Sequence, residues 1–353
     1  MERRLREGRF SDVPLANPFF DSLRQAYPPF DSWFQSKRDE PVLIIDDDEE
    51  LTGVVYLKYE DGPISDIRPV LPEGRWLKVG TMKVVARGTK LGERVLKRIF
   101  DEAISGFADG VYVTVFDVHD DLIRLFERYG FERWGTKTTI AGTELVLARK
   151  FGPLNDNPLT DYPFVRADAG VQPWLLAVYP AYHTRLFPDS ILRNESAAVL
   201  VRDIPSANTI HKVYIGRLPL TRMAPSDPVI LYRTTDKAGM ARFRSVATSL
   251  CVVEEVRSKD AFFDEEDFLT YCAPHSVFTE AELAAEYRRS RVLYVARMTY
   301  NASFEKRPTR GDLIDIVGIS EQHRWDLRPL TLEQFRAVAR LGGVDARLVV
   351  DKT

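Results

Sequence analysis

Apolar residues along the first 150 positions follow two different periods. Alternation with period two in β-branched stretches predicts strands, and recurrence every three to four residues predicts helices. One helical face is expected to carry Leu91, Val95, Ile99, Ala103 and Phe107, while charged residues occupy the other. The expected order is helices at 19–27 and 30–37, strands at 41–46, 51–59 and 75–85, a helix at 91–106, a strand at 111–116, a helix at 119–129 and a strand pair ending at 150. A meander followed by β-α-β-α-β predicts an α/β fold with a mixed sheet and flanking helices.

The remainder of the chain predicts a β-rich α+β region. The expected strands are 197–203, 212–218, 228–234, 245–256 and 291–300, with helices at about 262–272 and 280–290. Capping boxes open the helix after Thr279-x-x-Glu282 and a C-terminal helix after Thr331-x-x-Gln334, which Gly342-Gly343 ends. Many short strands with few helices predict a small barrel.

A cluster of Pro, Asn, Asp and Gly at 151–164 predicts a linker between two domains. The domains are expected at 1–150 and 165–353. A chain of 353 residues, 44% of them apolar, is long enough to form two hydrophobic cores.

Composition excludes several classes of protein. Two cysteines are too few for a disulfide framework, and five scattered histidines lack metal-ligand spacing, so we expect no metal. No apolar run approaches the roughly 18 residues of a membrane span, and the first ten residues lack a signal-peptide core, so a soluble cytoplasmic protein is expected. The net charge of −3 gives no bulk attraction to nucleic acid, which would need a local patch or a shaped pocket.

The stretch "VVARGTKLGERVLKRI", residues 84–99, joins a strand to a helix through a turn with two glycines and two cations. The unpaired N–H groups at a helix start and the helix dipole attract anions, and glycines allow close backbone approach. The stretch is therefore either an ordinary exposed turn or a loop that binds phosphate.

The segment downstream of this loop carries a family resemblance. After the strand at 111–116 comes "HDDLIRLFERYGF", residues 119–131. With it, residues 15–150 resemble the GNAT superfamily of N-acetyltransferases, whose pyrophosphate loop reads Q/R-x-x-G-x-G/A and whose following helix reads N-x-x-A-x-x-L-Y-x-x-x-G-F. The resemblance implies acetyl-CoA as acyl donor, bound between the strands at 75–85 and 111–116. The implied cofactor contacts are Met82, Lys83, Val84, Arg87, Gly88, Thr89, Lys90, Leu91, Gly92, Glu93, His119 and Phe126.

Three of these positions depart from the family pattern. Lys90 replaces a glycine, His119 replaces the Asn that usually contacts the cofactor, and Phe126 replaces the Tyr that often protonates the leaving thiolate. His119 either takes over that proton transfer or contacts only cofactor or solvent. Asp117 is a candidate general base, with a helix cap as its alternative role.

The strand at 75–85 offers Lys78 and Lys83 but no carboxylate, so it carries no general base. An α-amine with a pKa of about 7.7–8.0 needs little help to lose its proton, whereas a lysine at about 10.4 leaves roughly one molecule in 2,500 neutral at pH 7. The strand therefore favours an α-amine acceptor, such as an aminoacyl group.

Two further stretches have alternative interpretations. The acidic "DDDEE" at 46–50 is either a cation site or a solvated hairpin turn, and the aromatic residues at 18–34 either line a substrate groove or belong to the core.

The C-terminal half resembles PUA-like and ASCH-type barrels through "DPVILYRT" and "SVATSLCVVEEV". The resemblance implies an RNA or a modified base as ligand, with Arg233, Arg242 and Arg244 as candidate anion contacts or as parts of a solvated loop. We expect an N-acetyltransferase whose acceptor is an amine, with (aminoacyl-)tRNA as a candidate acceptor, as in toxins that an antitoxin neutralises. The alternatives are an enzyme whose second domain binds protein or a small molecule, and a GNAT fold that has lost catalysis and acts as a binding protein.

Overall fold

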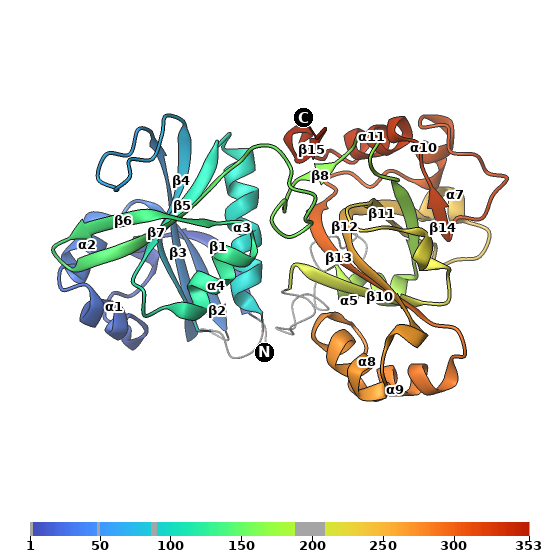
Figure 1. The fold of residues 1–353 in the computed structure, drawn as a ribbon, viewed down its shortest axis with the longest axis horizontal. Helices are drawn as coiled ribbons and strands as arrows, with labels where there is room; N and C mark the ends of the chain where they lie inside the picture. Colours follow the sequence, from blue (N-terminus) through green and yellow to red (C-terminus); the bar gives the residue numbers. More distant parts are fainter. Residues whose placement is uncertain (1–2, 48–49, 86–89, 188–208, 353) are drawn as a thin grey trace. The chain divides into compact units, whose positions relative to one another are not determined.

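The structure, a computed structural model, describes residues 3–47, 50–85, 90–187 and 209–352 (Figure 1). Of these, residues 3–152 form one compact unit and residues 153–352 form the other. The expected strand at 197–203 lies outside the described residues.

The first unit is built on a seven-stranded mixed sheet in the order β1-β2-β3-β4-β5-β7-β6. Only the central pair β4–β5 is parallel among the paired strands described for this sheet. The strands are β1 (Arg3–Arg9), β2 (Pro41–Asp47), β3 (Glu50–Asp61), β4 (Arg75–Val84), β5 (Gly110–Val115), β6 (Glu132–Thr139) and β7 (Gly142–Lys150). The helices are α1 (Asp21–Ala26), α2 (Phe30–Ser36), α3 (Leu91–Ser105) and α4 (Asp120–Arg128). This is the α/β mixed sheet with flanking helices that the sequence predicts.

The two faces of this sheet carry different helices. The Tyr59 hydroxyl donates a 2.7 Å hydrogen bond to the Glu102 carbonyl, which places α3 over the face that bears Tyr59. The neighbouring even positions of β3 point to the opposite face, because side chains alternate along a strand. On that face the ring of Tyr56 lies 6.0 Å from that of Trp33 in α2. The candidate functional site lies at the central strands, which separate the layer of α3 from the layer of α1 and α2.

Strands β4 and β5 separate within the sheet. Their parallel pairing runs from Trp76–Gly110 to Val79–Val113, while β4 continues to Val84 against β3. A register shift between Tyr56 and Leu57 leaves Gly80 unpaired as a bulge. The bulge changes the alternation, so that Lys78 before it and Lys83 after it both face the α1–α2 side.

The second unit contains a six-stranded mixed sheet in the order β10-β13-β12-β11-β9-β14. Its strands are β9 (Trp174–Val178), β10 (His211–Gly216), β11 (Pro228–Arg233), β12 (Val246–Ser258), β13 (Tyr294–Ser303) and β14 (Leu327–Pro329), and a short pair joins β8 (Val165–Arg166) to β15 (Val349–Val350). Its helices are α5 (Pro180–Leu186), α7 (Ala241–Arg244), α8 (Glu265–Cys272), α9 (Glu280–Arg289), α10 (Arg310–Asp315) and α11 (Leu332–Leu341). The capping boxes predicted at Thr279 and Thr331 are present, and Gly343 adopts φ 72° after α11.

The second unit begins at Pro153 rather than at 165. Leu154 and Tyr162 are buried, and the Tyr162 hydroxyl donates a hydrogen bond of 3.1 Å to the Tyr300 carbonyl of β13. Asp161 accepts hydrogen bonds from the backbone of Asn155 and Asn157. Most of the segment 151–164 is therefore ordered against the second unit instead of serving as a free linker.

Within the described ranges, no helix is long and apolar enough to cross a membrane. Cys251 and Cys272 are both buried free thiols.

Candidate functional site

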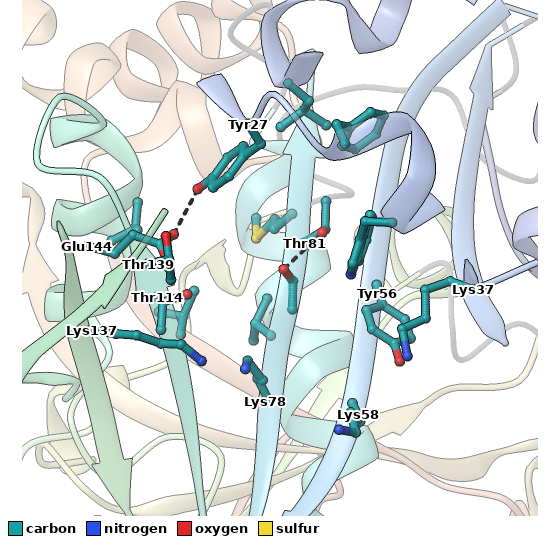
Figure 2. Close-up of a pocket in the computed structure, with 18 of the residues that line it drawn as sticks. Tyr27, Lys37, Tyr56, Lys58, Lys78, Thr81, Thr114, Lys137, Thr139 and Glu144 are labelled. Carbon is teal, nitrogen blue, oxygen red and sulfur yellow. Dashed lines mark hydrogen bonds between the residues drawn. The ribbon is translucent and has the colours of Figure 1, made fainter. Parts of the chain in front are cut away.

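A cavity of about 450 Å³ lies at the point where β4 and β5 separate. Its walls come from α1 and α2, from the middle of β3, from Lys78–Met82 of β4, from Val113–Val115 of β5, from the start of α4 and from β6 and β7. The cavity thus has residues of both faces of the sheet in its lining, which a continuous sheet would keep apart. Figure 2 shows its polar side chains gathered around the central strands.

The β4 backbone provides one wall on which an extended ligand can lie. Beyond Val79 its edge on the β5 side is not paired with β5, whereas its other edge stays paired with β3 as far as Val84. Backbone N–H and C=O groups on such an edge are available to an amide-containing chain. Met82 lines the cavity, and Lys83 and Val84 continue the same strand.

The start of α3 carries the described part of the predicted phosphate loop. Lys90 is in the left-handed conformation with φ 59°, and no side chain caps the helix. The first N–H groups of a helix lack intrahelical partners and attract anions. Gly92 offers no side chain of its own to block approach there. Arg87, Gly88 and Thr89 lie outside the described residues.

Glu93 is an unexpected feature of this helix start. Its side chain is only 4% exposed, and its carboxylate lies 4.0 Å from the Lys90 ammonium and 3.8 Å from the Arg128 guanidinium. A carboxylate in the first turn competes with a bound anion for the helix dipole. Among the described residues, two cations lie beside this carboxylate and offset its charge.

Lys83 does not point into the cavity. Its ammonium group donates hydrogen bonds to the Phe19 carbonyl and, at 2.5 Å, to the Ser22 hydroxyl. Burial lowers its pKa, although the charge of Asp21 opposes the effect. The side chain ties β4 to α1, so only the Lys83 backbone is suited to a cofactor.

The three candidates around α4 have different surroundings. His119, the residue before α4, is exposed to solvent and lines the cavity. Asp117 is exposed in the turn after β5 and is not among the residues that line the cavity. Phe126 is fully buried, with its ring 4.8 Å from that of Phe131. Phe126 therefore belongs to the core, and the expectation that it contacts the cofactor is corrected.

A carboxylate that the sequence did not reveal lies in the cavity. Glu144 of β7 is 6% exposed and accepts a 2.8 Å hydrogen bond from the Tyr27 hydroxyl (Figure 2). Burial, then the hydrogen bond and charge of Glu144, raise the pKa of Tyr27 well above its ordinary value. Tyr27 is therefore a proton-bearing donor that holds Glu144 in place. No local pattern in "GTELVLARK" marks Glu144, because its partner lies 117 positions away.

A second carboxylate, Glu60 of β3, is surrounded by donors. It accepts hydrogen bonds from the Tyr112 hydroxyl and, at 3.1 Å, from Lys58, and the Lys78 ammonium lies 3.7 Å away. Burial alone would raise the pKa of Glu60, but these donors outweigh it and lower the pKa. Such a carboxylate is a poor proton acceptor.

The aromatic segment at 18–34 contributes both to the hydrophobic core and to the lining of the cavity. Phe20, Phe30 and Phe34 are buried in a hydrophobic cluster with Phe10. Phe30 also lines the cavity, as do Tyr27 and Trp33.

The candidate anion contacts of the second unit are differently placed. Arg242 forms a bidentate pair with Asp315 at 2.7 and 2.8 Å, and Arg244 forms one with Asp236 at 2.8 Å. Both guanidinium groups thus pair with carboxylates of the same unit, and their role as anion contacts stays a prediction. Arg233 is buried, with an exposed fraction of 6%.

A buried polar group sits close to Arg233. His183 of α5 is fully buried, and its Nε2 lies 2.7 Å from the Thr248 hydroxyl of β12. Burial, followed by the charges of Arg233 and Arg307, lowers the pKa of His183 to about 3. His183 Nδ1 and two guanidinium nitrogens of Arg307 have no hydrogen-bond partner among the described residues.

Across the described ranges of the chain, no three His, Cys, Asp or Glu side chains cluster as a metal would require. The acidic "DDDEE" turn is only partly described, and there Asp46 pairs with Arg6 at 2.8 Å.

Comparison with known proteins finds similar solved structures but no similar sequence. No family model matches the sequence, and no curated protein does. An ASCH protein from Zymomonas mobilis is 11% identical, with a TM-score of 0.33 over 48% of this chain and 94% of its own. A GNAT family acetyltransferase from Elizabethkingia anophelis, solved with acetyl-CoA bound, is 12% identical, with a TM-score of 0.31 over 42% of this chain and 99% of its own. An IAA acetyltransferase from Bacillus cereus is 12% identical, with a TM-score of 0.33 and the same coverage.

The matching structures include both kinds named by the sequence resemblance, GNAT acetyltransferases and an ASCH protein. At these identities the likeness is one of fold alone.

Proposed function

We propose that the protein is an acyl-CoA-dependent N-acetyltransferase that transfers an acetyl group to an amine. The observation that carries the proposal is the parting of β4 and β5 after Val79 and Val113, with a cavity of about 450 Å³ at the parting. An unpaired strand edge suits the amide-containing arm of the cofactor, and the start of α3 suits its phosphates. When bound, acetyl-CoA supplies the acetyl group as a reactive thioester.

The cofactor-binding residues in this proposal fall in two groups. The backbone of Met82, Lys83 and Val84 holds the extended arm, and the helix start from Lys90 to Glu93 holds the pyrophosphate. Arg87, Gly88 and Thr89 complete the loop in the proposal, on the strength of the sequence resemblance alone.

Proton transfers are assigned to side chains that line the cavity. A protonated amine must lose a proton before it attacks, and we assign that proton to a carboxylate oxygen of Glu144, which Tyr27 orients. The departing thiolate needs a proton or solvation. We assign this role to His119, which lies immediately before α4 and lines the cavity. Asp117 remains a weaker candidate base, because its carboxylate does not line the cavity.

We propose that the acceptor is an α-amine. With (aminoacyl-)tRNA as the acceptor, each unit has a role, acetyl transfer in the first and RNA binding in the second. The second unit would then bind RNA in the cytoplasm, and a toxin of this kind would have an antitoxin or regulator as partner. Support for an anionic ligand comes from the buried cation Arg233 and the unpartnered guanidinium nitrogens of Arg307 among the described residues. The alternative is a second unit that binds a protein or a small molecule.

A second candidate function is binding without catalysis. It is favoured by Phe126, which is buried and has no hydroxyl to donate, and by Lys90 in place of a loop glycine. Under this alternative the protein binds acetyl-CoA but transfers nothing.

Incubation with radiolabelled acetyl-CoA and separate pools of total RNA, protein and metabolites tests the proposal. We expect label in one pool, in an alkali-stable amide. Binding of acetyl-CoA with no label in any pool would support the binding protein instead.

A further inference from the structure

Two lysine side chains converge on one another at one end of the cavity. Lys78 of β4 and Lys137 of β6 are 18% and 16% exposed, and Figure 2 shows their ammonium groups pointing toward each other. Strands β5 and β7 lie between β4 and β6, so their backbones are roughly 14 Å apart at about 4.8 Å per strand. Both side chains must therefore extend over the sheet to meet, and Lys78 does so 5.5 Å from the centre of the Tyr112 ring.

This lysine pair lies among several other charged groups. Lys78 lies 3.7 Å from Glu60, which also accepts a hydrogen bond from Lys58, and Lys137 pairs with Asp66. Lys58, Lys78 and Lys137 thus lie close to Glu60 and Asp66, and Glu144 lies opposite Lys137 in the β6–β7 ladder. Burial is the main reason that the pKa of Lys78 is lowered; Lys137 lowers it further, while Glu60 and Asp66 oppose the shift. An anion between the two ammonium groups would relieve their repulsion.

A third polar group in the same cavity has a hydroxyl available to a ligand. Tyr56 is 3% exposed and lines the cavity, and its hydroxyl has no hydrogen-bond partner among the described residues. Burial, then the charges of Glu40 and Glu60, raise its pKa to about 12, so it keeps its proton at neutral pH. Buried hydroxyls in proteins are nearly always paired, and a bound polar ligand would pair this one.

The position of the lysine pair relates it to acyl transfer. Lys78 precedes by one residue the Val79–Val113 pair at which the strands part. Lys137 lies directly opposite Glu144 in the β6–β7 ladder, so the base and the cation are neighbours across two strands. A small molecule that contacts Lys78 and Lys137 therefore has its other end near Glu144.

We propose that Lys78 and Lys137 bind an anionic group of the acyl acceptor, so that the substrate is an amine with a carboxylate or phosphate a few bonds from its nitrogen. This inference rests on the acetyl transfer proposed above. It favours a free amino acid or another small amine over the aminoacyl-tRNA proposed there, because the carboxylate of an aminoacyl group is esterified and its nearest phosphate lies many bonds from the amine. It excludes polyamines and lysine-rich peptides as preferred acceptors, because the two ammonium groups repel their additional positive charges.

Product-like probes test the site without turnover. Calorimetry at low ionic strength, in a buffer free of phosphate and with CoA present, measures the affinity of N-acetylglycine against its neutral amide N-acetylglycinamide. The phosphate counterpart is N-acetyl-phosphoethanolamine against N-acetylethanolamine, so the two pairs distinguish a carboxylate from a phosphate ligand. We expect at least one charged probe to bind about tenfold or more tightly than its neutral counterpart.

Lys78→Gln and Lys137→Gln should each reduce that ratio to about threefold or less. Lys37→Gln is the matched control, because Lys37 lines the same cavity beside Tyr56, away from the pair (Figure 2). Its ratio should stay at the wild-type value. Unchanged CoA affinity in each variant shows that the unit is folded.

Equal affinity for charged and neutral probes, no binding of either charged probe, or a ratio that survives in both lysine variants would overturn the inference. The acetyl-transfer proposal fails separately: charged probes that bind a protein with no affinity for CoA or acetyl-CoA would retain the anion site and remove the enzyme. Binding of CoA together with equal affinity for charged and neutral probes would retain the enzyme and remove the anion site.

Discussion

The Tyr27 hydroxyl donates a 2.8 Å hydrogen bond to the Glu144 carboxylate, and both residues line the cavity where β4 and β5 part. The bond joins the end of α1 to β7, two elements at opposite ends of the first unit's sequence. We propose that this bond orients the general base that β4 lacks.

Glu144→Gln should lower kcat about 10²-fold or more, because the amide cannot accept the amine's proton. The substitution keeps the size of the side chain and an oxygen that accepts the Tyr27 hydrogen bond, so acetyl-CoA affinity should not change. Tyr27→Phe is the matched control and should lower kcat by about tenfold or less, since it removes only the orienting bond. Steady-state kinetics measure both effects, and an active Glu144→Gln enzyme would contradict the assignment.

His119→Ala should lower kcat about 10²-fold while leaving cofactor affinity intact, because the imidazole protonates or polarises the thiolate. Calorimetry with acetyl-CoA supplies the affinity and steady-state assays supply kcat. An unchanged kcat would mean that water protonates the thiolate and that His119 is only a neighbour of the cavity.

Limited proteolysis should cut close to Gly152, which is exposed at the boundary between the two units, although not at the Gly152–Pro153 bond itself, because most proteases do not cleave before proline. A fragment of residues 153–353 should be more stable than one of 165–353, which lacks the buried side chains of Leu154 and Tyr162. Loss of one large buried side chain costs about 3–5 kcal/mol. Equal melting temperatures for the two fragments would show that 154–163 adds nothing to the second unit.

His183 should make stability fall as pH falls. Its pKa is about 3 in the folded protein against about 6.5 when unfolded, so the unfolded state binds the proton first between those values. Lowering the pH from 7 to 5 should cost the wild type about 2 kcal/mol more than His183→Asn, which has no imidazole to titrate. Denaturant unfolding of the full chain at both pH values measures the difference, and parallel pH dependences would contradict the buried neutral histidine.

Local patterns predicted the elements well where each residue's role depends on its near neighbours. The helical face predicted from Leu91, Val95, Ile99, Ala103 and Phe107 is buried as far as Ala103, but Phe107 lies beyond the end of α3 and is 70% exposed. Both predicted capping boxes form. Strand β1 was missed, because "RRLREGR" has no apolar alternation and is a strand only through its pairing with β2. Strand β9, α5 and α10 were also not predicted.

The site was harder to predict than the fold, because its chemistry depends on contacts between distant segments. Tyr27 and Glu144 are 117 positions apart, and Arg242 pairs with Asp315 across 73 positions. Asp117 follows a strand as a catalytic carboxylate would, yet it is exposed and is not among the residues that line the cavity. Phe126 aligns with a functional tyrosine, but its ring is part of the core.

The most direct test of the account is acetyl-CoA binding by calorimetry in the wild type, Gly92→Asn and Gly92→Asp. A Cβ at Gly92 lies 3.0 Å from a terminal methyl of Leu125, which a small side-chain movement relieves in both variants alike. The carboxylate favours the helix start electrostatically, so it should not unfold α3, but it repels a pyrophosphate. We predict binding to the wild type and to Gly92→Asn, and at least about tenfold weaker binding to Gly92→Asp. A wild-type protein that does not bind acetyl-CoA, or equal affinities for Gly92→Asn and Gly92→Asp, would contradict the account.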